Sequence, residues 1–134
     1  MIEYAESVGG IEAGQLEEGF FADWPTPPSP ERHLELLHGS DHVVLARDGE
    51  RVVGFATAIS DGVLSAYVPL LEVLPSYQGE GIGSELMRRL LARLDDLYTV
   101  DLCCDADLEP FYRRLGLQVL ERGMGIRNRE ALRR

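Results

Sequence analysis

The residues best suited to chemistry in this sequence form a glycine-rich segment near the middle of the chain. An apolar pattern with helical spacing follows the segment, whose residues are Gln78, Gly79, Glu80, Gly81, Ile82, Gly83 and Ser84. Glycines at alternate positions lack Cβ atoms, so a ligand can approach the backbone closely. The unpaired N–H groups and the dipole of a helix N-terminus favour an anion, and a diphosphate suits both features.

Two well-known phosphate-binding patterns do not match this segment. A Rossmann fingerprint requires G-x-G-x-x-G, and Ser84 stands where its last glycine should be. A P-loop requires G-x-x-x-x-G-K-[ST], and no lysine follows these glycines. The pattern that does fit is Q-x-x-G-x-G, formed by Gln78, Gly81 and Gly83. A glycine-rich turn that only starts a helix remains the alternative.

The elements before this segment are predicted from spacing and from proline positions. Residues 1–6 favour a short strand, and residues 12–24 carry apolar side chains at near-helical spacing, which predicts a helix. Ser29 followed by Pro30 is typical of a helix start, and Gly39 of its end.

From His42 onward the period changes to that of strands. Residues 42–47 and 51–59 predict a hairpin, and residues 63–74 a third strand in which Pro69 favours a bulge. The remaining elements are a helix over residues 84–97, a buried strand over 98–104, a helix that ends at Gly116, and short strands over 117–121 and 124–127. This order predicts an α/β fold with a mixed, mainly antiparallel central sheet and flanking helices.

Length and charge narrow the function classes. The 134 residues fit one domain, and the net charge of −10 argues against a nucleic-acid partner while suiting a cationic small substrate. No apolar run is long enough for a membrane span, and the acidic N-terminus does not resemble a secretory signal. We therefore expect a cytoplasmic protein that binds neither nucleic acid nor membrane.

The cysteines and histidines predict no metal site. Cys103 and Cys104 are adjacent, so we expect reduced thiols, one facing the core and one facing away. His33, His38 and His42 match no metal-ligand spacing and favour surface or hairpin positions.

Two motifs together resemble the GCN5-related N-acetyltransferases (GNAT superfamily). The first is Q-x-x-G-x-G at Gln78, and the second is Phe111-Tyr112-Arg113-Arg114-Leu115-Gly116-Leu117, which looks like F-Y-x-x-x-G-F some 30 residues later. The resemblance covers residues 42–127. It implies one acetyltransferase domain over residues 1–134, with an acceptor side in 1–41, an acetyl-CoA-binding core in 42–127 and a loose tail in 128–134.

The resemblance implies a sheet that splays open between the strands ending at Leu74 and at Cys104. Pantetheine would lie in this split and pair with main chain near Val73, with Asp105 either touching it or capping a helix. The pyrophosphate would lie on the backbone N–H groups of Gly79, Glu80, Gly81, Ile82, Gly83 and Ser84. The family often pairs through sheet edges or C-terminal strands, so a homodimer is one expectation.

The chemistry that follows is attack of a free amine on a thioester. The resemblance implies Tyr112 as the general acid for the leaving thiolate, and a backbone N–H near Val73 as the oxyanion donor. Glu72 is the candidate base, although strand alternation need not direct it to the acceptor, and Asp101, Asp105 or a water chain are the other options.

The resulting expectation is transfer of an acetyl group from acetyl-CoA to a primary amine of a small molecule or peptide. Two alternatives stay open: a related enzyme that uses another acyl-CoA or nucleophile, and a domain that binds CoA as a sensor without turnover. A third, binding of ATP or NAD, would require the glycine segment to prefer those nucleotides.

Overall fold

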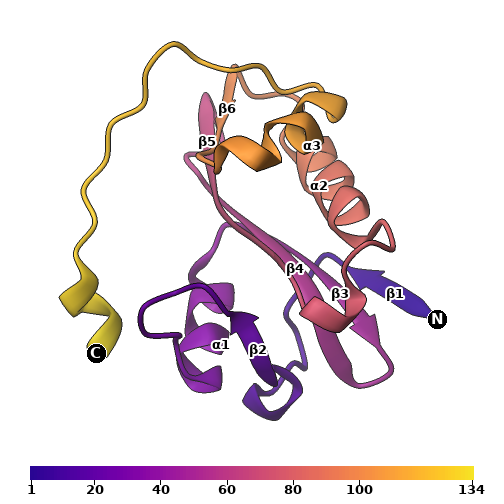
Figure 1. Cartoon of the computed structure of the whole chain (residues 1–134). Coiled ribbons are helices and arrows are strands. Elements are labelled where there is room, and N and C mark those ends of the chain that lie inside the picture. Colours follow the sequence, from indigo (N-terminus) through magenta and orange to yellow (C-terminus); the bar gives the residue numbers. More distant parts are fainter.

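The computed structural model describes residues 1–134 and has one five-stranded sheet at its centre (Figure 1). Its strand order is β1-β3-β4-β5-β6. The strands are β1 (Ile2–Ala5), β3 (His42–Asp48), β4 (Arg51–Ser60), β5 (Ser65–Val73) and β6 (Thr99–Asp101). All neighbours are antiparallel except β5 and β6. The predicted mixed, mainly antiparallel sheet with flanking helices is confirmed.

Strand β5 carries the predicted bulge at Pro69. Thr57 pairs with Leu70, whereas Ile59 pairs with Tyr67, so β5 contains one residue more than β4 across this step. Proline has no N–H to donate to a ladder, and a bulge relieves that loss. Bulges typically increase the local twist of a strand, and this one lies shortly before the C-terminal end of β5 at Val73.

The parallel pairing of β5 with β6 is short and opens a split in the sheet. Only Ser65, Ala66 and Tyr67 pair with β6, opposite Thr99, Val100 and Asp101. Beyond them, β5 continues to Val73 without a neighbour on that side. The expected split therefore lies between β5 and β6, although β6 is shorter than predicted.

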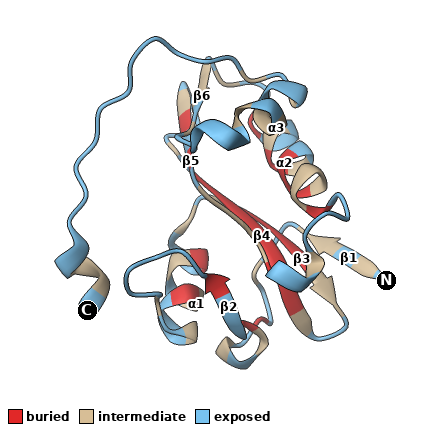
Figure 2. Ribbon diagram, viewed as in Figure 1, coloured by how far each residue is buried: buried red, intermediate tan, exposed pale blue.

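Helices lie on both sides of the sheet (Figures 1 and 2). On one side are α2 (Ile82–Arg93) and α3 (Glu109–Arg114), and on the other are α1 (Pro30–Gly39) and the short strand β2 (Glu18–Phe21). Where α2 packs on β3 and β4, the fully buried residues include Val44, Leu86, Met87 and Leu90. On the opposite face of the sheet they include Leu37, Leu45 and Phe55. Figure 2 shows these buried segments as a continuous band through the sheet.

Helix α1 begins as predicted. The Ser29 hydroxyl accepts a hydrogen bond from the Arg32 N–H at 3.2 Å, and Pro30 is the first helical residue. The helix ends at Gly39, where the Ser40 hydroxyl donates to the carbonyl of Leu36 at 2.7 Å.

The helix predicted over residues 12–24 is wrong. This stretch forms a single 3-10 turn at Ala13–Gln15 and then strand β2. Gly19 has a φ of 120° and Phe21 a φ of 60°, and neither value is compatible with a right-handed helix. Two glycines weaken helix formation here, and the burial of Phe20 and Phe21 against the sheet outweighs the apolar spacing.

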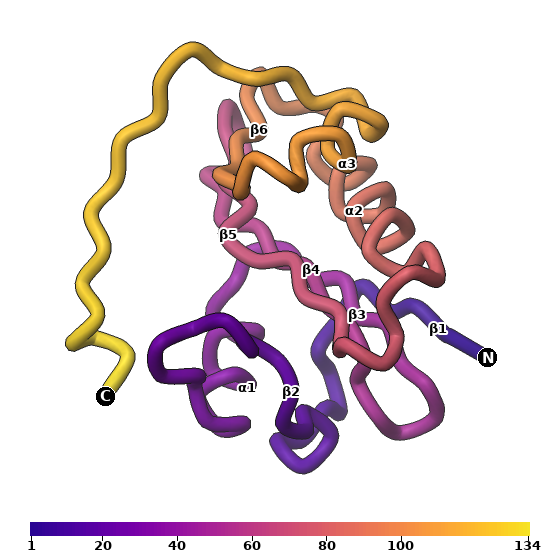
Figure 3. The backbone as a smooth tube through the Cα atoms, viewed as in Figure 1, coloured from indigo at the N-terminus to yellow at the C-terminus, as the bar shows by residue number.

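The two strands predicted over residues 117–121 and 124–127 are also wrong. The chain after α3 has no strand, and residues 118–130 are exposed throughout. Figures 1 and 3 show this segment leaving the body of the molecule as a long arm that ends in the 3-10 helix Arg129–Arg133. No helix in the structure combines the length and the apolar character that a membrane span needs.

Candidate active site

The glycine segment connects β5 to α2 through a tight turn. A 3-10 turn at Pro75–Tyr77 follows the strand, and Gly79 and Gly81 then adopt φ values of 82° and 83°. This left-handed conformation is readily available only to glycine. Gly81 is the N-cap of α2, and a Cβ at either glycine would meet no atom within 4 Å. The backbone is therefore open on the side from which a ligand would approach.

The N–H groups of this segment form an unpaired cluster. None of the backbone N–H groups from residue 79 to residue 84 donates a hydrogen bond within the chain, and the first helical bond starts at Glu85. Gly81 also offers no side chain that caps the helix. Successive unpaired N–H groups at the positive end of a helix dipole make a site for a polyanion.

The side chain of Gln78 binds the end of β5. Its Nε2 donates a hydrogen bond to the Val73 carbonyl at 3.0 Å, so it fixes the loop against the strand. The Leu74 N–H binds the Val53 carbonyl on β4 at 2.9 Å, which by ladder alternation directs the Val73 N–H away from β4. The Val73 N–H therefore points into the split as a free donor.

Helix α3 closes the other side of the split. An added Cβ on Gly83 would lie 3.7 Å from Phe111 Cζ and 3.8 Å from Val73 Cγ2, so α2, α3 and β5 meet at this point. Gly116, with a φ of 95°, ends α3 in a Schellman motif in which the Leu117 N–H donates to the Tyr112 carbonyl. The second motif thus positions an aromatic pair beside the glycine loop.

Tyr112 is half-buried next to Phe111, with the two rings edge to face and their centroids 4.9 Å apart. Burial, together with the negative charge that Cys104 would carry, raises the pKa of Tyr112 to about 12. The phenol therefore stays protonated across the whole physiological range and can donate a hydrogen bond or a proton.

Glu72 lies on the opposite face of β5 from α2. Because Val73 faces Gly83, its neighbour Glu72 must face β2 and α1, and its Oε1 accepts a hydrogen bond from the Phe21 N–H at 2.9 Å. Burial raises the pKa of this carboxyl, the Phe21 N–H lowers it, and the nearby Asp23 raises it further. A carboxylate whose pKa is raised is better matched to take a proton near neutral pH.

A cavity of about 520 Å³ lies on this same face, between β2, the proline-rich loop and α1. Its lining residues include Phe20, Phe21 and His33, together with the acidic residues Glu17 and Glu18, and the Glu17 carboxylate is paired with Arg51 at 3.2 Å. Cavities of this size accommodate small organic molecules. Since Phe21 also binds Glu72, the cavity and the candidate base share one wall.

His33 is buried, which corrects its predicted surface position. It is 2% exposed, packs against Phe20, Phe21 and Phe55, and its Nε2 has no hydrogen-bond partner. Burial lowers its pKa to about 4. His33 lies four residues before the buried Leu37 on α1, so helical spacing was the signal that could have identified it.

We expect His33 to make the fold sensitive to acid. Its pKa is lower in the folded than in the unfolded chain, so stability is complete above about pH 6.5 and falls as pH decreases toward 4, by roughly 3 kcal/mol. Thermal melting between pH 7 and 4 should show this fall in the wild type and a smaller one in His33→Leu. His38→Leu, at an exposed position of the same helix, should keep the wild-type dependence. Identical curves for all three proteins would contradict the assignment.

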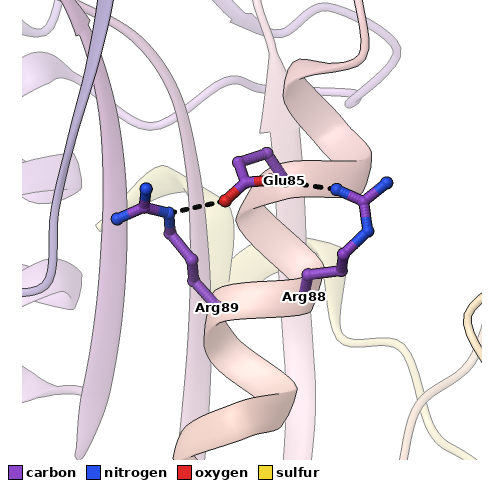
Figure 4. Close-up of polar contacts among 3 residues, drawn as sticks. All are labelled: Glu85, Arg88 and Arg89. Atoms are coloured by element: carbon purple, nitrogen blue, oxygen red, sulfur yellow. Dashed lines mark hydrogen bonds and ion pairs between the residues drawn. The ribbon is translucent and has the colours of Figure 1, made fainter.

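Glu85, the one acidic residue in the first turn of α2, forms ion pairs with two arginines on the same helix (Figure 4). Glu85 lies 2.9 Å from Arg88 and 2.8 Å from Arg89, and these partners lower its pKa. Arg89 also stacks on Tyr4 at 4.7 Å, which joins β1 to α2. The pairing offsets the negative charge of the one acid in the first turn of α2.

The family is settled by comparison with known proteins. The model of the acetyltransferase (GNAT) family matches residues 13–117, which include the split, the glycine loop and α3. The chain belongs to this family. A crystal structure of a protein from Deinococcus radiodurans R1, named as an acetyltransferase, is 46% identical, with a TM-score of 0.91 over 96% of this chain and 90% of that one.

Other GNAT relatives are more distant. A GNAT-family acetyltransferase from Streptococcus pneumoniae TIGR4 is 32% identical, with a TM-score of 0.79 over 96% of this chain and 99% of that one. The chloroplastic serotonin N-acetyltransferase 2 of Oryza sativa subsp. japonica is 35% identical over 80% of this chain and 56% of its own length. This chain spans about half the length of the curated relatives it matches.

Within this GNAT fold, the predicted residues fall into three groups. Val73, Gln78, Gly83 and the N–H groups of residues 79–84 are brought together at the split. Ile82 is buried, so only its backbone is available, and the side chains of Glu80 and Asp105 are exposed and form no hydrogen bond. Glu72 faces the cavity side of β5. Both cysteines are exposed, so the prediction that one of them faces the core is wrong. No group of three or more His, Cys, Asp or Glu side chains is arranged to hold a metal ion.

Proposed function

We propose that the protein transfers the acetyl group of acetyl-CoA to a primary amine of a small molecule or peptide. The observation that carries the proposal is the row of unpaired N–H groups from residue 79 to residue 84, which opens beside a split of the sheet. A diphosphate on these groups would leave the acyl arm free to follow the open edge of β5 toward Val73. Membership of the GNAT family supports acetyl-CoA as the donor.

In the proposed reaction, the two faces of β5 have different tasks. The acceptor amine would enter from the face of Glu72, give up its proton to that carboxylate or to water, and attack the thioester carbon. The Val73 N–H would stabilise the oxyanion of the tetrahedral intermediate. The C–S bond would then break, and the amide and CoA thiol would be released, with Tyr112 as the donor to the departing sulfur.

The high pKa of Tyr112 makes full proton transfer to the leaving thiolate unfavourable. A thiolate with a pKa near ~8.5 takes a proton from a phenol of pKa about 12 only against a gradient of roughly 3 to 4 pKa units. We therefore propose that Tyr112 acts mainly as a hydrogen-bond donor that stabilises the developing thiolate. Water can complete the protonation after the thiol has left.

The cavity beside Glu72 is the proposed acceptor site. The acidic residue Glu18 at its wall suits an ammonium group during entry, and its aromatic wall suits an apolar substituent. The resemblance to a relative named for acetylating serotonin makes aromatic amines the first acceptors to examine. A cytoplasmic location is proposed as well, supported by the two unpaired cysteines.

The experiment that tests the function measures CoA release from acetyl-CoA by a panel of amines. The panel should contain aromatic alkylamines, polyamines, amino acids and short peptides, each with and without protein. Turnover of any amine supports the proposal. Acetyl-CoA binding without turnover of any amine would instead favour the sensor alternative.

We expect Glu72→Gln to remove the acid limb of the rate profile. With Glu72 as the base, kcat/KM rises with pH through the raised pKa of this carboxyl, and the amide should lower it by about 10²-fold or more. The raised pKa has the opposite effect on stability. The folded chain binds this proton more tightly than the unfolded chain does, so the free energy of unfolding decreases as pH rises above the ordinary glutamate pKa. The variant should thus be no less stable at neutral pH. Glu31→Gln, at an exposed position of α1, is the matched control, and a wild-type profile in Glu72→Gln would place the base elsewhere.

A further inference from the structure

We propose that the imidazole of His33 forms a hydrogen bond with a hydroxyl group of the acceptor, so that the cavity selects aromatic amines with a ring hydroxyl. The inference rests on the proposed function, in which the cavity of about 520 Å³ receives the acceptor. His33 is then a specificity-determining residue, which decides the choice of acceptor and takes no part in the transfer itself.

His33 is the one residue of the cavity wall with a buried polar atom that lacks a partner. Four buried side-chain atoms in the structure have no hydrogen-bond partner, and they belong to His33, Arg47, Arg51 and Thr57. Of these four residues, only His33 lines the cavity. A buried polar group that nothing in the chain satisfies is unfavourable, so beside a cavity it indicates a partner that enters from outside.

The imidazole has a fixed position at the cavity wall, where the buried segments of α1 and β2 lie side by side (Figure 2). Its ring centroid lies 5.2 Å from that of Phe20, 5.1 Å from that of Phe21 and 4.5 Å from that of Phe55. Only 2% of His33 is exposed, so the residue meets the cavity along a narrow edge. Such an edge suits a single small polar group, and the packed ring loses little freedom when it binds one.

The charge state of the ring favours a hydroxyl over a charged group. Burial lowers the pKa of His33 to about 4, so the imidazole is neutral at physiological pH. A neutral imidazole has one donor and one acceptor nitrogen, and a hydroxyl can pair with either of them in either tautomer. A carboxylate or a phosphate would lose its hydration there and gain no opposite charge in return.

The remaining polar groups of the wall are engaged or lie at the surface. The Glu17 carboxylate is paired with Arg51 at 3.2 Å, and the Ser29 hydroxyl accepts the cap hydrogen bond from the Arg32 N–H. Glu18 is exposed, where it suits the ammonium group of an entering amine. Two phenylalanines and three prolines make up much of the rest of the wall. An aromatic ring with one polar substituent matches this lining.

Phe21 connects His33 to the candidate base. The Phe21 N–H donates to Glu72 Oε1 at 2.9 Å, and the Phe21 ring lies 5.1 Å from the imidazole. Glu72 and His33 therefore contact the same phenylalanine, one at its backbone and the other at its ring. A short arylalkylamine can place its amine toward Glu72 and its ring hydroxyl toward His33.

Two amines that differ by one hydroxyl test the proposal. Tyramine carries a ring hydroxyl and phenethylamine lacks it, and calorimetry measures their binding with and without CoA, which has no acetyl group to transfer. The single tryptophan reports entry into the cavity, because the Trp24 ring packs edge to face on Phe21 at 5.1 Å. We expect both amines to change the Trp24 emission, and tyramine to bind about 10-fold more tightly or better.

Variants at His33 show whether this residue causes the preference. His33→Leu keeps the apolar packing and removes both ring nitrogens, so it should bind the two amines equally, with the wild-type affinity for phenethylamine. His33→Gln again supplies a donor and an acceptor and should regain part of the preference for tyramine. His38→Leu, at an exposed position of the same helix, is the matched control and should keep the full preference.

The binding experiment separates this inference from the proposed reaction. A tyramine preference that His33→Leu removes upholds the inference even if no amine of the panel is acetylated, a result that would count only against the proposed transfer. Equal affinity of the wild type for the two amines, an unchanged preference in His33→Leu, or no binding of either amine at millimolar concentration overturns the inference. A bound water would then be the partner of His33, and turnover of the amine panel would still decide the proposed function.

Discussion

Replacing Gly81 with valine should abolish acetyl-CoA binding while leaving the fold in place. Gly81 has a φ of 83°, and it is the N-cap of the helix whose N–H groups are unpaired. A β-branched residue strains this backbone, and its side chain would fill the open space beside the loop. We expect the dissociation constant to rise by at least 100-fold.

Thermal melting with and without acetyl-CoA measures this loss. In the wild type, ligand at 100 times its dissociation constant stabilises the fold by about 2.7 kcal/mol, which raises the midpoint by several degrees. The same concentration should leave the midpoint of Gly81→Val unchanged. ATP and NAD serve as ligand controls and should shift neither protein.

Backbone strain must be separated from loss of the site, and the chain offers a matched glycine for this purpose. Gly49 lies in the turn between β3 and β4 with a φ of 64°, and it also has no atom within 4 Å of an added Cβ. Gly49→Val should therefore lower the melting temperature by a similar amount and keep the full ligand shift. If both variants keep the shift, the loop does not hold the diphosphate, and the proposed donor site is wrong.

The parts of the fold that could be predicted from the sequence are those in which local and tertiary preferences agree. Helix α1 has its Ser29 cap and proline start, α2 has a clear apolar stripe, and Pro69 marks the bulge. In each case the residue type that favours the local geometry also suits the packing. The Gln78 and Phe111 motifs belong to this group, because glycine conformation and helix ends are local properties.

The predictions that failed depend on packing or on partners. Residues 12–24 have helical spacing, but Phe20 and Phe21 are buried against β4 and β5 as a strand, and Phe21 accepts a positive φ. No local sequence pattern indicates that these residues form a strand. The strands predicted after Gly116 are absent from the sheet, and residues 118–130 are exposed instead.

The candidate site divides in the same way. The local geometry of the proposed donor side could be predicted because one contiguous segment forms it, from Val73 to Ser84. The acceptor side depends on the meeting of β2, α1 and Glu72, which lie far apart in sequence. The prediction of a surface position for His33 is wrong for the same reason, because its burial depends on aromatic rings of two other elements, β2 and β4.

Replacing Tyr112 with phenylalanine should lower kcat by about 10² to 10³-fold while leaving acetyl-CoA binding unchanged. The hydroxyl is the only group lost, and the ring keeps its edge-to-face packing on Phe111. A fixed hydrogen-bond donor to a developing negative charge typically contributes a rate factor of this order. Because the contribution arises in the transition state, kcat and kcat/KM should fall together.

The pH dependence distinguishes Tyr112 from any other titrating group. Its pKa of about 12 means that its ionisation cannot limit the rate below about pH 11. An alkaline fall of kcat at pH 8 to 10 in the wild type must therefore persist in Tyr112→Phe. Tyr98→Phe is the matched control, because Tyr98 is exposed next to β6 and should retain full activity.

Each result for Tyr112→Phe has one interpretation. A fall in kcat with an unchanged acetyl-CoA melting shift identifies an enzyme in which the phenol acts on the leaving sulfur. An unchanged kcat would mean that the thiolate leaves without help, which its low pKa of roughly 8.5 makes chemically reasonable, and would reduce Tyr112 to a packing residue. A lost melting shift would show instead that the hydroxyl helps to hold the donor, so the second motif would belong to binding rather than to the chemical step.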